Sequence, residues 1–70
     1  MSGRPKPKYK AGDYLTIYCG LNEGCCFIVC GVRWANDDRW QPARWEYYTG
    51  MYGWRAENTI CTEAYARLVP

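Results

Sequence analysis

Apolar and polar side chains alternate along residues 14–19, the first regular stretch of the chain. Leu15 and Ile17 fall on one side of this alternation, and Tyr14 and Tyr18 fall on the other. Successive side chains of a β-strand point to opposite faces, so the pattern predicts a strand. We expect its aliphatic face to pack in the core and its two tyrosines to lie on the outer face.

Three further segments have the pattern of strands. Residues 25–34 form a long apolar run with β-branched and aromatic residues, which is typical of a central strand. Gly31 lies inside this run and predicts a bend. Residues 43–49 alternate aromatic and charged side chains and predict a third strand, and residues 54–56 predict a short fourth one. Loops that contain glycine, or asparagine and aspartate, separate these segments.

The C-terminal residues predict one helical turn followed by a last short strand. Thr62 can cap the turn and Glu63 stands in its first positions, where a negative charge is favourable. Leu68 and Val69 then form the fifth strand. Short strands, glycine turns and a single late helical turn predict a mainly all-β fold, closed into a small five-stranded barrel.

The predicted core is small, and the aromatic residues exceed its room. Eleven of the twelve aromatics are Tyr or Trp. A barrel of this size holds about six to eight large side chains. The aliphatic and phenylalanine side chains that compete for this space are Leu15, Ile17, Phe27, Ile28, Val29, Val32, Ile60, Leu68 and Val69. Part of the Tyr and Trp set is therefore expected at the surface.

The order of these elements resembles that of small SH3-like β-barrels. The chain has Tyr9, Lys10, Gly12 and Asp13 before its first strand, and a glycine-flanked loop before the apolar return strand. The resemblance implies a barrel domain over residues 9–70 behind a flexible arm, residues 1–8. The short chain, rich in Cys and Trp, is also similar in style to small accessory proteins of bacteriophages.

Charge is unevenly distributed along the chain. Residues 1–10 hold four of the nine basic residues and no acid, while the remaining 60 residues hold five basic and seven acidic ones, a balance of −2. A basic arm of this kind is either a solvated leader or a segment that contacts phosphate or an acidic partner. The second interpretation predicts binding of RNA or single-stranded DNA through Arg4, Lys6, Lys8, Lys10, Arg39 and Arg44.

Several function classes are excluded or disfavoured by composition. The chain has no histidine, which removes the usual general base and every His-containing metal site. Its five cysteines are odd in number and lack a Cys-x-x-Cys pair, so we expect reduced thiols in a cytoplasm that act as small core hydrophobes. No apolar run reaches about 18 residues, and the basic start is not followed by the apolar stretch of a secretory signal. We expect no membrane partner, metal, cofactor or catalytic residue.

Surface Tyr and Trp on a nearly neutral domain favour a protein or peptide partner. The function predicted is non-enzymatic binding, in the manner of a phage protein that modulates a host protein. The alternative is that the rings pack on each other and cap the ends of the barrel. Nothing in the pattern indicates an oligomeric state. The residues predicted to bind the partner are Tyr14, Tyr18, Trp40, Tyr48, Tyr52, Trp54, Asp37 and Asp38.

Overall fold

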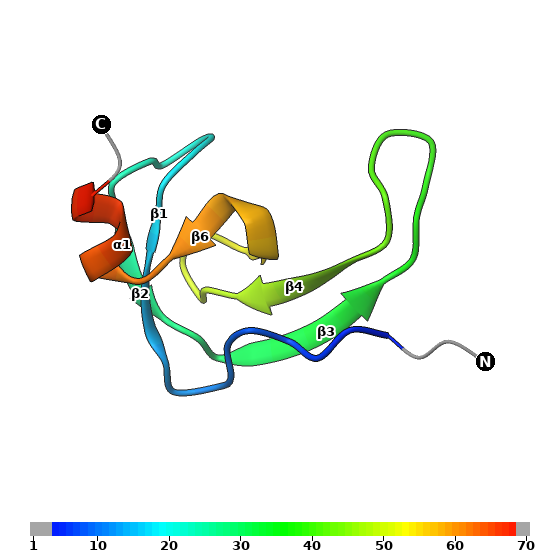
Figure 1. Ribbon diagram of the computed structural model, residues 1–70, viewed down its shortest axis with the longest axis horizontal. Helices are drawn as coiled ribbons and strands as arrows, with labels where there is room; N and C mark the ends of the chain where they lie inside the picture. Colours follow the sequence, from blue (N-terminus) through cyan, green and yellow to red (C-terminus); the bar gives the residue numbers. More distant parts are fainter. Residues whose placement is uncertain (1–3, 69–70) are drawn as a thin grey trace.

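A computed structural model describes residues 4–68 and contains two small antiparallel sheets (Figure 1). In the first sheet, β1 (Tyr14–Ile17) is the central strand between β2 (Cys26–Ile28) and β6 (Ile60–Cys61). The strand and its predicted core face are confirmed, because Leu15 and Ile17 are both buried. Thr16, which the alternation places on the outer face, is buried as well.

The second sheet has the order β3 (Gly31–Ala35), β4 (Arg44–Tyr48) and β5 (Trp54–Ala56). A single 3₁₀ turn, η1 (Glu57–Thr59), leads from β5 back to the first sheet. The helix α1 (Glu63–Leu68) follows β6 and packs against β1 (Figure 1).

A mainly β fold with one short C-terminal helix is therefore confirmed, but the closed five-stranded barrel is wrong. Six strands form two three-stranded sheets, and over residues 4–68 no ladder joins these sheets into a closed barrel. The predicted central strand divides at Val29 and Cys30, just before Gly31. Val29 N–H donates to the Asp13 carbonyl oxygen at 2.9 Å, whereas Cys30 N–H donates to that of Tyr48 at 2.8 Å. The chain thus changes its hydrogen-bonding partner, and its sheet, at this bend.

The core lies between the two sheets. Five of the predicted core residues are buried, namely Leu15, Ile17, Phe27, Val29 and Ile60, and Val32 is half-buried. Ile28 is 55% exposed, contrary to the prediction, because it follows the buried Phe27 and pairs with Tyr14 on the outer face. Leu68 is also exposed, since it ends α1 instead of entering a strand. Val69 lies outside the described residues.

Tyr47 is a core residue that is absent from the predicted core, which contains only aliphatic side chains and phenylalanine. Its side chain is fully buried, and the edge of the Tyr9 ring packs on it at 5.5 Å between centroids. A buried hydroxyl without a partner would cost about 1–3 kcal/mol. Tyr47 avoids this cost because its hydroxyl donates to Glu57 Oε2 at 2.5 Å.

The predicted cap of the C-terminal helix is confirmed. Tyr65 N–H donates to Thr62 Oγ1 at 3.2 Å, and Glu63 is in the first turn. The helix continues through Leu68, so the last strand predicted from this residue is wrong. Within residues 4–68, no helix has the length and apolar character needed to cross a membrane.

The cysteines are all unpaired, and they do not share a core role. Cys61 on β6 is buried, but Cys19, Cys26 and Cys30 are exposed and Cys25 is half-buried. The expectation that all five act as core hydrophobes is therefore wrong for most of them. Cys26 begins β2 with its side chain exposed, and the other three lie in the segments just before and after this strand.

Candidate functional site

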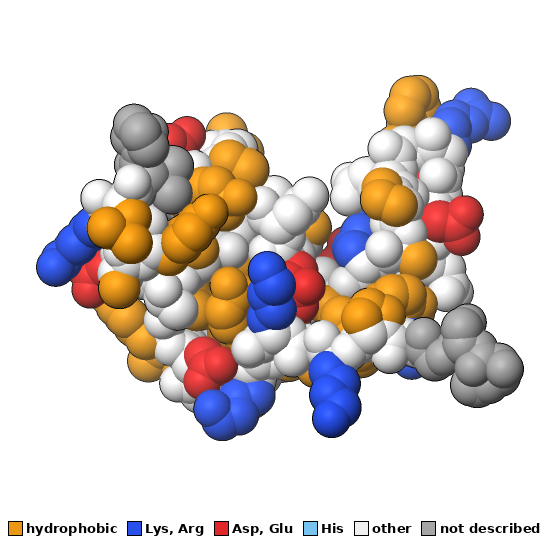
Figure 2. Space-filling model, viewed as in Figure 1, with side chains coloured by type: hydrophobic (Ala, Val, Ile, Leu, Met, Phe, Trp, Pro, Cys, Tyr) orange, Lys and Arg blue, Asp and Glu red, His pale blue; other side chains and the backbone are white. Residues whose placement is uncertain are grey.

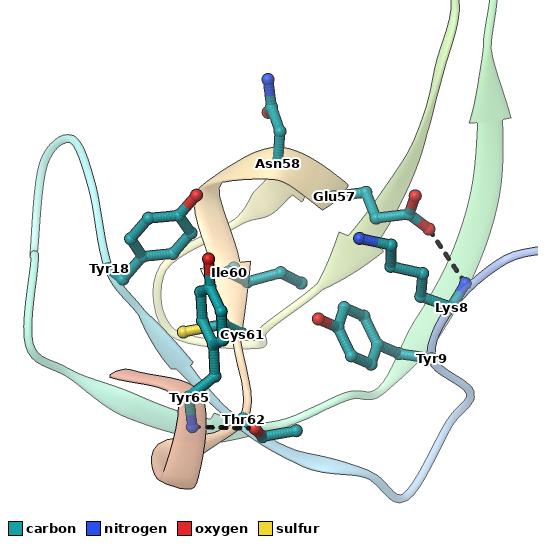
Figure 3. A pocket seen from close by; sticks show the side chains of 9 residues that line it. All are labelled: Lys8, Tyr9, Tyr18, Glu57, Asn58, Ile60, Cys61, Thr62 and Tyr65. Carbon is teal, nitrogen blue, oxygen red and sulfur yellow. Dashed lines mark hydrogen bonds between the residues drawn. The ribbon is translucent and has the colours of Figure 1, made fainter. Parts of the chain in front are cut away.

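A pocket of about 410 Å³ opens where the N-terminal segment, η1, β6 and α1 meet (Figure 3). The pocket is lined by three tyrosine rings, one carboxylate, one amide and one ammonium group. The two side chains of β6 also belong to the lining. The lining residues are Lys8, Tyr9, Tyr18, Glu57, Asn58, Ile60, Cys61, Thr62 and Tyr65.

Two of the rings form one wall. Tyr18 directly follows β1, and its backbone N–H donates to the Thr59 carbonyl oxygen at 3.0 Å. Tyr65 comes from α1 and meets Tyr18 edge to face, with 6.2 Å between the ring centroids. The side chains of Ile60 and Cys61 lie between this wall and the opposite one (Figure 3). Because both are buried in β6, this part of the pocket is rigidly supported.

The opposite wall contains Tyr9, Lys8 and Glu57. Glu57 Oε2 accepts two hydrogen bonds, from the Tyr47 hydroxyl at 2.5 Å and from Lys8 N–H at 3.0 Å. These bonds fix the carboxylate on the 3₁₀ turn and tie the N-terminal segment to the core. In the described part of the chain no hydrogen bond reaches the second oxygen, Glu57 Oε1. That oxygen can accept a hydrogen bond from a ligand.

The pocket holds few ionised groups at neutral pH. Burial raises the pKa of the Tyr9 hydroxyl and of the Cys61 thiol. For Tyr47, burial and then the hydrogen bond to Glu57 raise the pKa further above its ordinary value. These shifts favour the neutral forms of the Tyr9 phenol and the Cys61 thiol. Such a lining can bind apolar and hydrogen-bonding groups, but it holds no thiolate or imidazole to act as a nucleophile or base.

The tyrosines and tryptophans predicted to bind a partner are dispersed over several surfaces. Tyr18 lines the pocket, whereas Tyr14 lies at the other end of β1 beside Ile28. Tyr52 is half-buried and packs on the core. None of these three positions adjoins the exposed Trp40, which lies in the loop between β3 and β4.

Tyr48 and Trp54 form a separate cluster on the second sheet. They face each other across β4 and β5, with 5.1 Å between the ring centroids. The Arg33 guanidinium lies 4.1 Å from the Trp54 ring centroid. This geometry is that of a cation–π pair that spans β4, between the two outer strands of the sheet. Together with the contact of the two rings, it supports the alternative that some rings pack on each other.

Residues 36–43 stand away from the body as a projecting loop (Figure 2). Asp38 shapes this loop, because its Oδ1 accepts hydrogen bonds from Trp40 N–H and Gln41 N–H, both at 2.8 Å. These two backbone bonds also lower the pKa of the Asp38 carboxyl. Asp37 lies exposed in the same loop. Neither carboxylate lines the pocket.

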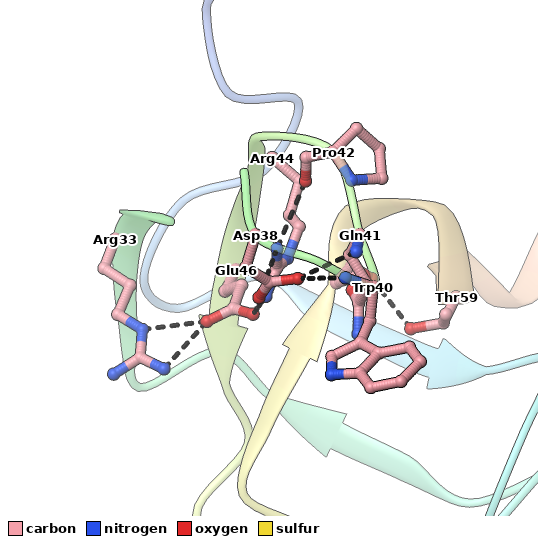
Figure 4. A network of polar contacts seen from close by, with 9 residues as sticks. Arg33, Asp38, Trp40, Gln41, Pro42, Arg44, Glu46 and Thr59 are labelled. Atoms are coloured by element: carbon pink, nitrogen blue, oxygen red, sulfur yellow. Dashed lines mark hydrogen bonds and ion pairs between the residues drawn. The ribbon is translucent and has the colours of Figure 1, made fainter. Parts of the chain in front are cut away.

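A network of ion pairs lies at the base of the loop (Figure 4). Glu46 is buried between Arg33 and Arg44, each of which places a guanidinium nitrogen 2.8 Å from a carboxylate oxygen. Arg44 Nη1 also donates to the Pro42 carbonyl oxygen at 3.1 Å and lies 3.9 Å from Asp38. The network holds the loop to β4.

The basic residues of the nucleic-acid alternative do not form one surface. Arg44 is committed to Glu46, and Lys10 is paired with Asp13 at 3.0 Å. Arg39 lies in the projecting loop, 6.0 Å from the Trp40 ring centroid. The other three, Arg4, Lys6 and Lys8, belong to the N-terminal segment.

Sequence reasoning missed Tyr9, Tyr65, Glu57 and Asn58 as parts of one site, and assigned Lys8 to nucleic acid. They come together because Ile17 pairs with Ile60, which brings the end of β1 beside η1 and α1. The one available signal is the capping residue Thr62, which places Tyr65 in the first turn of the helix.

Within residues 4–68, no group of three or more Cys, Asp or Glu side chains converges to hold a metal ion. The pocket lining accordingly points to binding by rings, an amide and a carboxylate. No family model matches the chain, and no curated protein or solved structure matches it either, so the geometry of the pocket carries the functional argument.

Proposed function

We propose that this chain is a non-enzymatic binding module that takes a segment of a protein or peptide into the Tyr9–Tyr18–Tyr65 pocket. The observation that carries the proposal is a volume of about 410 Å³ lined by three tyrosine rings beside an unused carboxylate oxygen. Pockets of about 300–1,000 Å³ with apolar walls and a few convergent polar groups are the usual form of a ligand site.

The lining favours an extended peptide with a compact apolar side chain. The ring faces and Ile60 offer apolar contact to that side chain. A backbone N–H of the peptide can donate to Glu57 Oε1, and the Asn58 amide can pair with its carbonyl oxygen. These two contacts would orient the segment, while the tyrosines supply contact area at low conformational cost.

Binding is favoured over catalysis by the chemistry of the lining. The chain has no histidine, and burial keeps the Cys61 thiol protonated by raising its pKa. The pocket therefore has neither an imidazole nor a thiolate, the groups that most often act as general base or nucleophile, and this favours binding.

Kinship with SH3-like modules is part of this proposal. Its support is the order of the elements, with two three-stranded sheets and a 3₁₀ turn before the last strand. A cytoplasmic location and a role as a phage-type modulator of a host protein belong to the same proposal.

A random-peptide display library selected on the immobilised chain tests the proposal. The enriched peptide is then synthesised and titrated by calorimetry into the wild type, Tyr65→Ala and Tyr14→Ala. The two side chains are similarly exposed, at 52% and 55%, but only Tyr65 lines the pocket. We expect Tyr65→Ala to weaken binding about tenfold, as the loss of a central aromatic contact does, and Tyr14→Ala to leave it unchanged.

Two outcomes would contradict the proposal. One is a library that yields no peptide above an unrelated control protein. The other is a loss of affinity in Tyr14→Ala but not in Tyr65→Ala, which would favour a surface at the far end of β1.

A further inference from the structure

The N-terminal segment, residues 4–8, lies against the second sheet (Figure 1). Its sequence is Arg-Pro-Lys-Pro-Lys. The Arg4 guanidinium lies 5.5 Å from the Trp34 ring centroid, and Trp45 Nε1 donates a hydrogen bond of 2.6 Å to the Pro5 carbonyl oxygen. At the other end of the segment, Lys8 N–H donates to Glu57. Three separate contacts thus hold this segment.

The surface under the segment is a pair of tryptophans. Trp34 and Trp45 are direct partners on β3 and β4, and their rings meet edge to face at 5.2 Å. They lie on the same face as the core residue Tyr47, two positions along β4 from Trp45. Both are only half-buried, so they extend the apolar face of the sheet beyond the core. The N-terminal segment covers this extension.

None of these contacts depends on the segment belonging to the same chain. A cation over an indole, and an indole N–H that donates to a main-chain carbonyl, recognise any extended segment with a basic residue before a proline. Two prolines favour the extended conformation in advance and lower the entropy lost on binding. In the structure the same chain makes these contacts in cis.

We infer that the Trp34–Trp45 surface is a second binding site, for an extended Arg-Pro segment of a partner protein, which residues 4–8 occupy as an intramolecular competitor. The tethered segment acts at an effective concentration in the millimolar range. A partner segment must therefore bind more tightly, or be more concentrated, to displace it. Lys8 and Tyr9 also line the pocket, so displacing the segment would alter one pocket wall. Only this last consequence rests on the proposed function.

The four tryptophans provide a direct test by nuclear magnetic resonance. The full chain, labelled with ¹⁵N and ¹³C, shows one indole N–H signal for each tryptophan once assigned. The probe is the capped peptide Ac-Arg-Pro-Lys-Pro-Lys-NH₂, titrated into the wild type, Arg4→Ala and Lys6→Ala. Arg4 lies over Trp34, whereas within residues 4–68 Lys6 makes no hydrogen bond or cation–π pair with either tryptophan, so Lys6→Ala is the matched loss of one positive charge.

We expect the Trp34 and Trp45 signals to move on addition of the peptide while the Trp40 signal stays in place. An exposed cation–π contact corresponds to about a 2- to 5-fold change in affinity. Arg4→Ala should therefore reach half-saturation at about 2- to 5-fold lower peptide concentration than the wild type. Lys6→Ala should match the wild type, and a peptide with alanine in place of its arginine should bind more weakly to all three.

Each of the following results would overturn the inference. The first is an absence of indole shifts in Arg4→Ala at several millimolar peptide. The second is an identical response of Arg4→Ala and Lys6→Ala. The third is a wild-type Trp45 indole N–H that exchanges with water as fast as that of the exposed Trp40. A dimer that the peptide dissociates would assign the surface to the N-terminal segment of a second copy instead. Because the readout is at Trp34 and Trp45, these outcomes do not depend on the pocket.

Discussion

Replacing Glu46 with glutamine should destabilise the fold by about 2 kcal/mol at neutral pH, and this cost should shrink in acid. Glu46 is almost fully buried and joins two arginines. Its Oε1 accepts from Arg33 Nε at 2.9 Å, and its Oε2 accepts from Arg44 Nε at 3.1 Å and Nη2 at 2.8 Å. Glutamine keeps the shape but has one acceptor oxygen in place of two.

The magnitude follows from the guanidinium that loses its acceptor. Hydrogen bonds to charged groups contribute about 1.5–3 kcal/mol each to stability when they are shielded from water. The Arg33 side chain is 51% exposed and regains hydration, whereas the Arg44 side chain is only 18% exposed and does not. The net loss is therefore expected near the lower part of this range, about 2 kcal/mol.

The pH dependence has a definite sign. Burial by itself would raise the pKa of Glu46, but the hydrogen bonds from Arg33 and Arg44 outweigh it and hold the pKa below its ordinary value of 4.5. A carboxyl with a lowered pKa in the folded state stabilises the fold above its unfolded pKa, and this contribution is lost as pH falls through the folded value. The glutamine variant has no such titration. The lowered pKa of Asp13 occurs in both proteins and cancels in the difference. That of Asp38 rests mainly on hydrogen bonds from Trp40 N–H and Gln41 N–H, which the substitution does not remove.

Urea unfolding followed by circular dichroism at about pH 7 and about pH 3 measures this difference. The control is Glu63→Gln, which removes an exposed helix pair with Arg67 at 3.3 Å and should cost less than about 0.5 kcal/mol. An equal cost of Glu46→Gln at the two pH values would refute the electrostatic reasoning. So would a control variant that loses as much stability as Glu46→Gln.

Four further substitutions probe the core and a turn. Tyr47→Phe removes the hydroxyl that donates to Glu57 and should lower the urea midpoint by the equivalent of about 1.5–3 kcal/mol; an unchanged midpoint would contradict the role of this bond. Leu15→Ala should cost about 2–5 kcal/mol in thermal unfolding, and Ile28→Ala far less, because Ile28 is exposed; equal costs would place Ile28 in the core after all. Thr49→Val removes two buried hydrogen bonds, to the Gly53 carbonyl and from Tyr52 N–H, and should cost about 1–2 kcal/mol in urea, whereas stability equal to the wild type would show that the turn does not need them.

Local signals in the sequence were sufficient for some elements and insufficient for others. The alternation around Leu15 and Ile17 and the cap at Thr62 act over a few residues, and both are confirmed. The division of residues 25–34 depends on partners far along the chain, since Val29 and Cys30 bond to different sheets. Gly31 marks a bend in this run, but no local feature indicates that the chain changes from one sheet to the other there.

The misplaced core residues have a similar cause. A ranking by apolar character prefers Ile28 and Leu68 to Tyr47, because it counts the cost of a buried hydroxyl but not the partner that removes it. That partner is Glu57, ten residues further along the chain. The pocket was equally beyond local reasoning, because Tyr9, Tyr18 and Tyr65 meet only through the pairing of β1 with β6. The alternation could predict only that Tyr18 lies away from the Leu15–Ile17 face, and Tyr18 is half-buried in the structure.

Each of the two sheets has two edge strands, which no further strand of the described chain pairs with. These edge strands are β2 and β6 in the first sheet, and β3 and β5 in the second. Exposed edges can template the addition of a strand from another molecule, which leads to aggregation. Here β2 and β5 are three residues long and β6 only two, too short to offer a long template. The one five-residue edge, β3, carries Arg33, whose charge opposes stacking of identical strands. Short strands and a charged edge thus protect the open sheets against edge-to-edge pairing, which a barrel prevents by closing. We therefore expect that lengthening β5 or neutralising Arg33 would promote self-association.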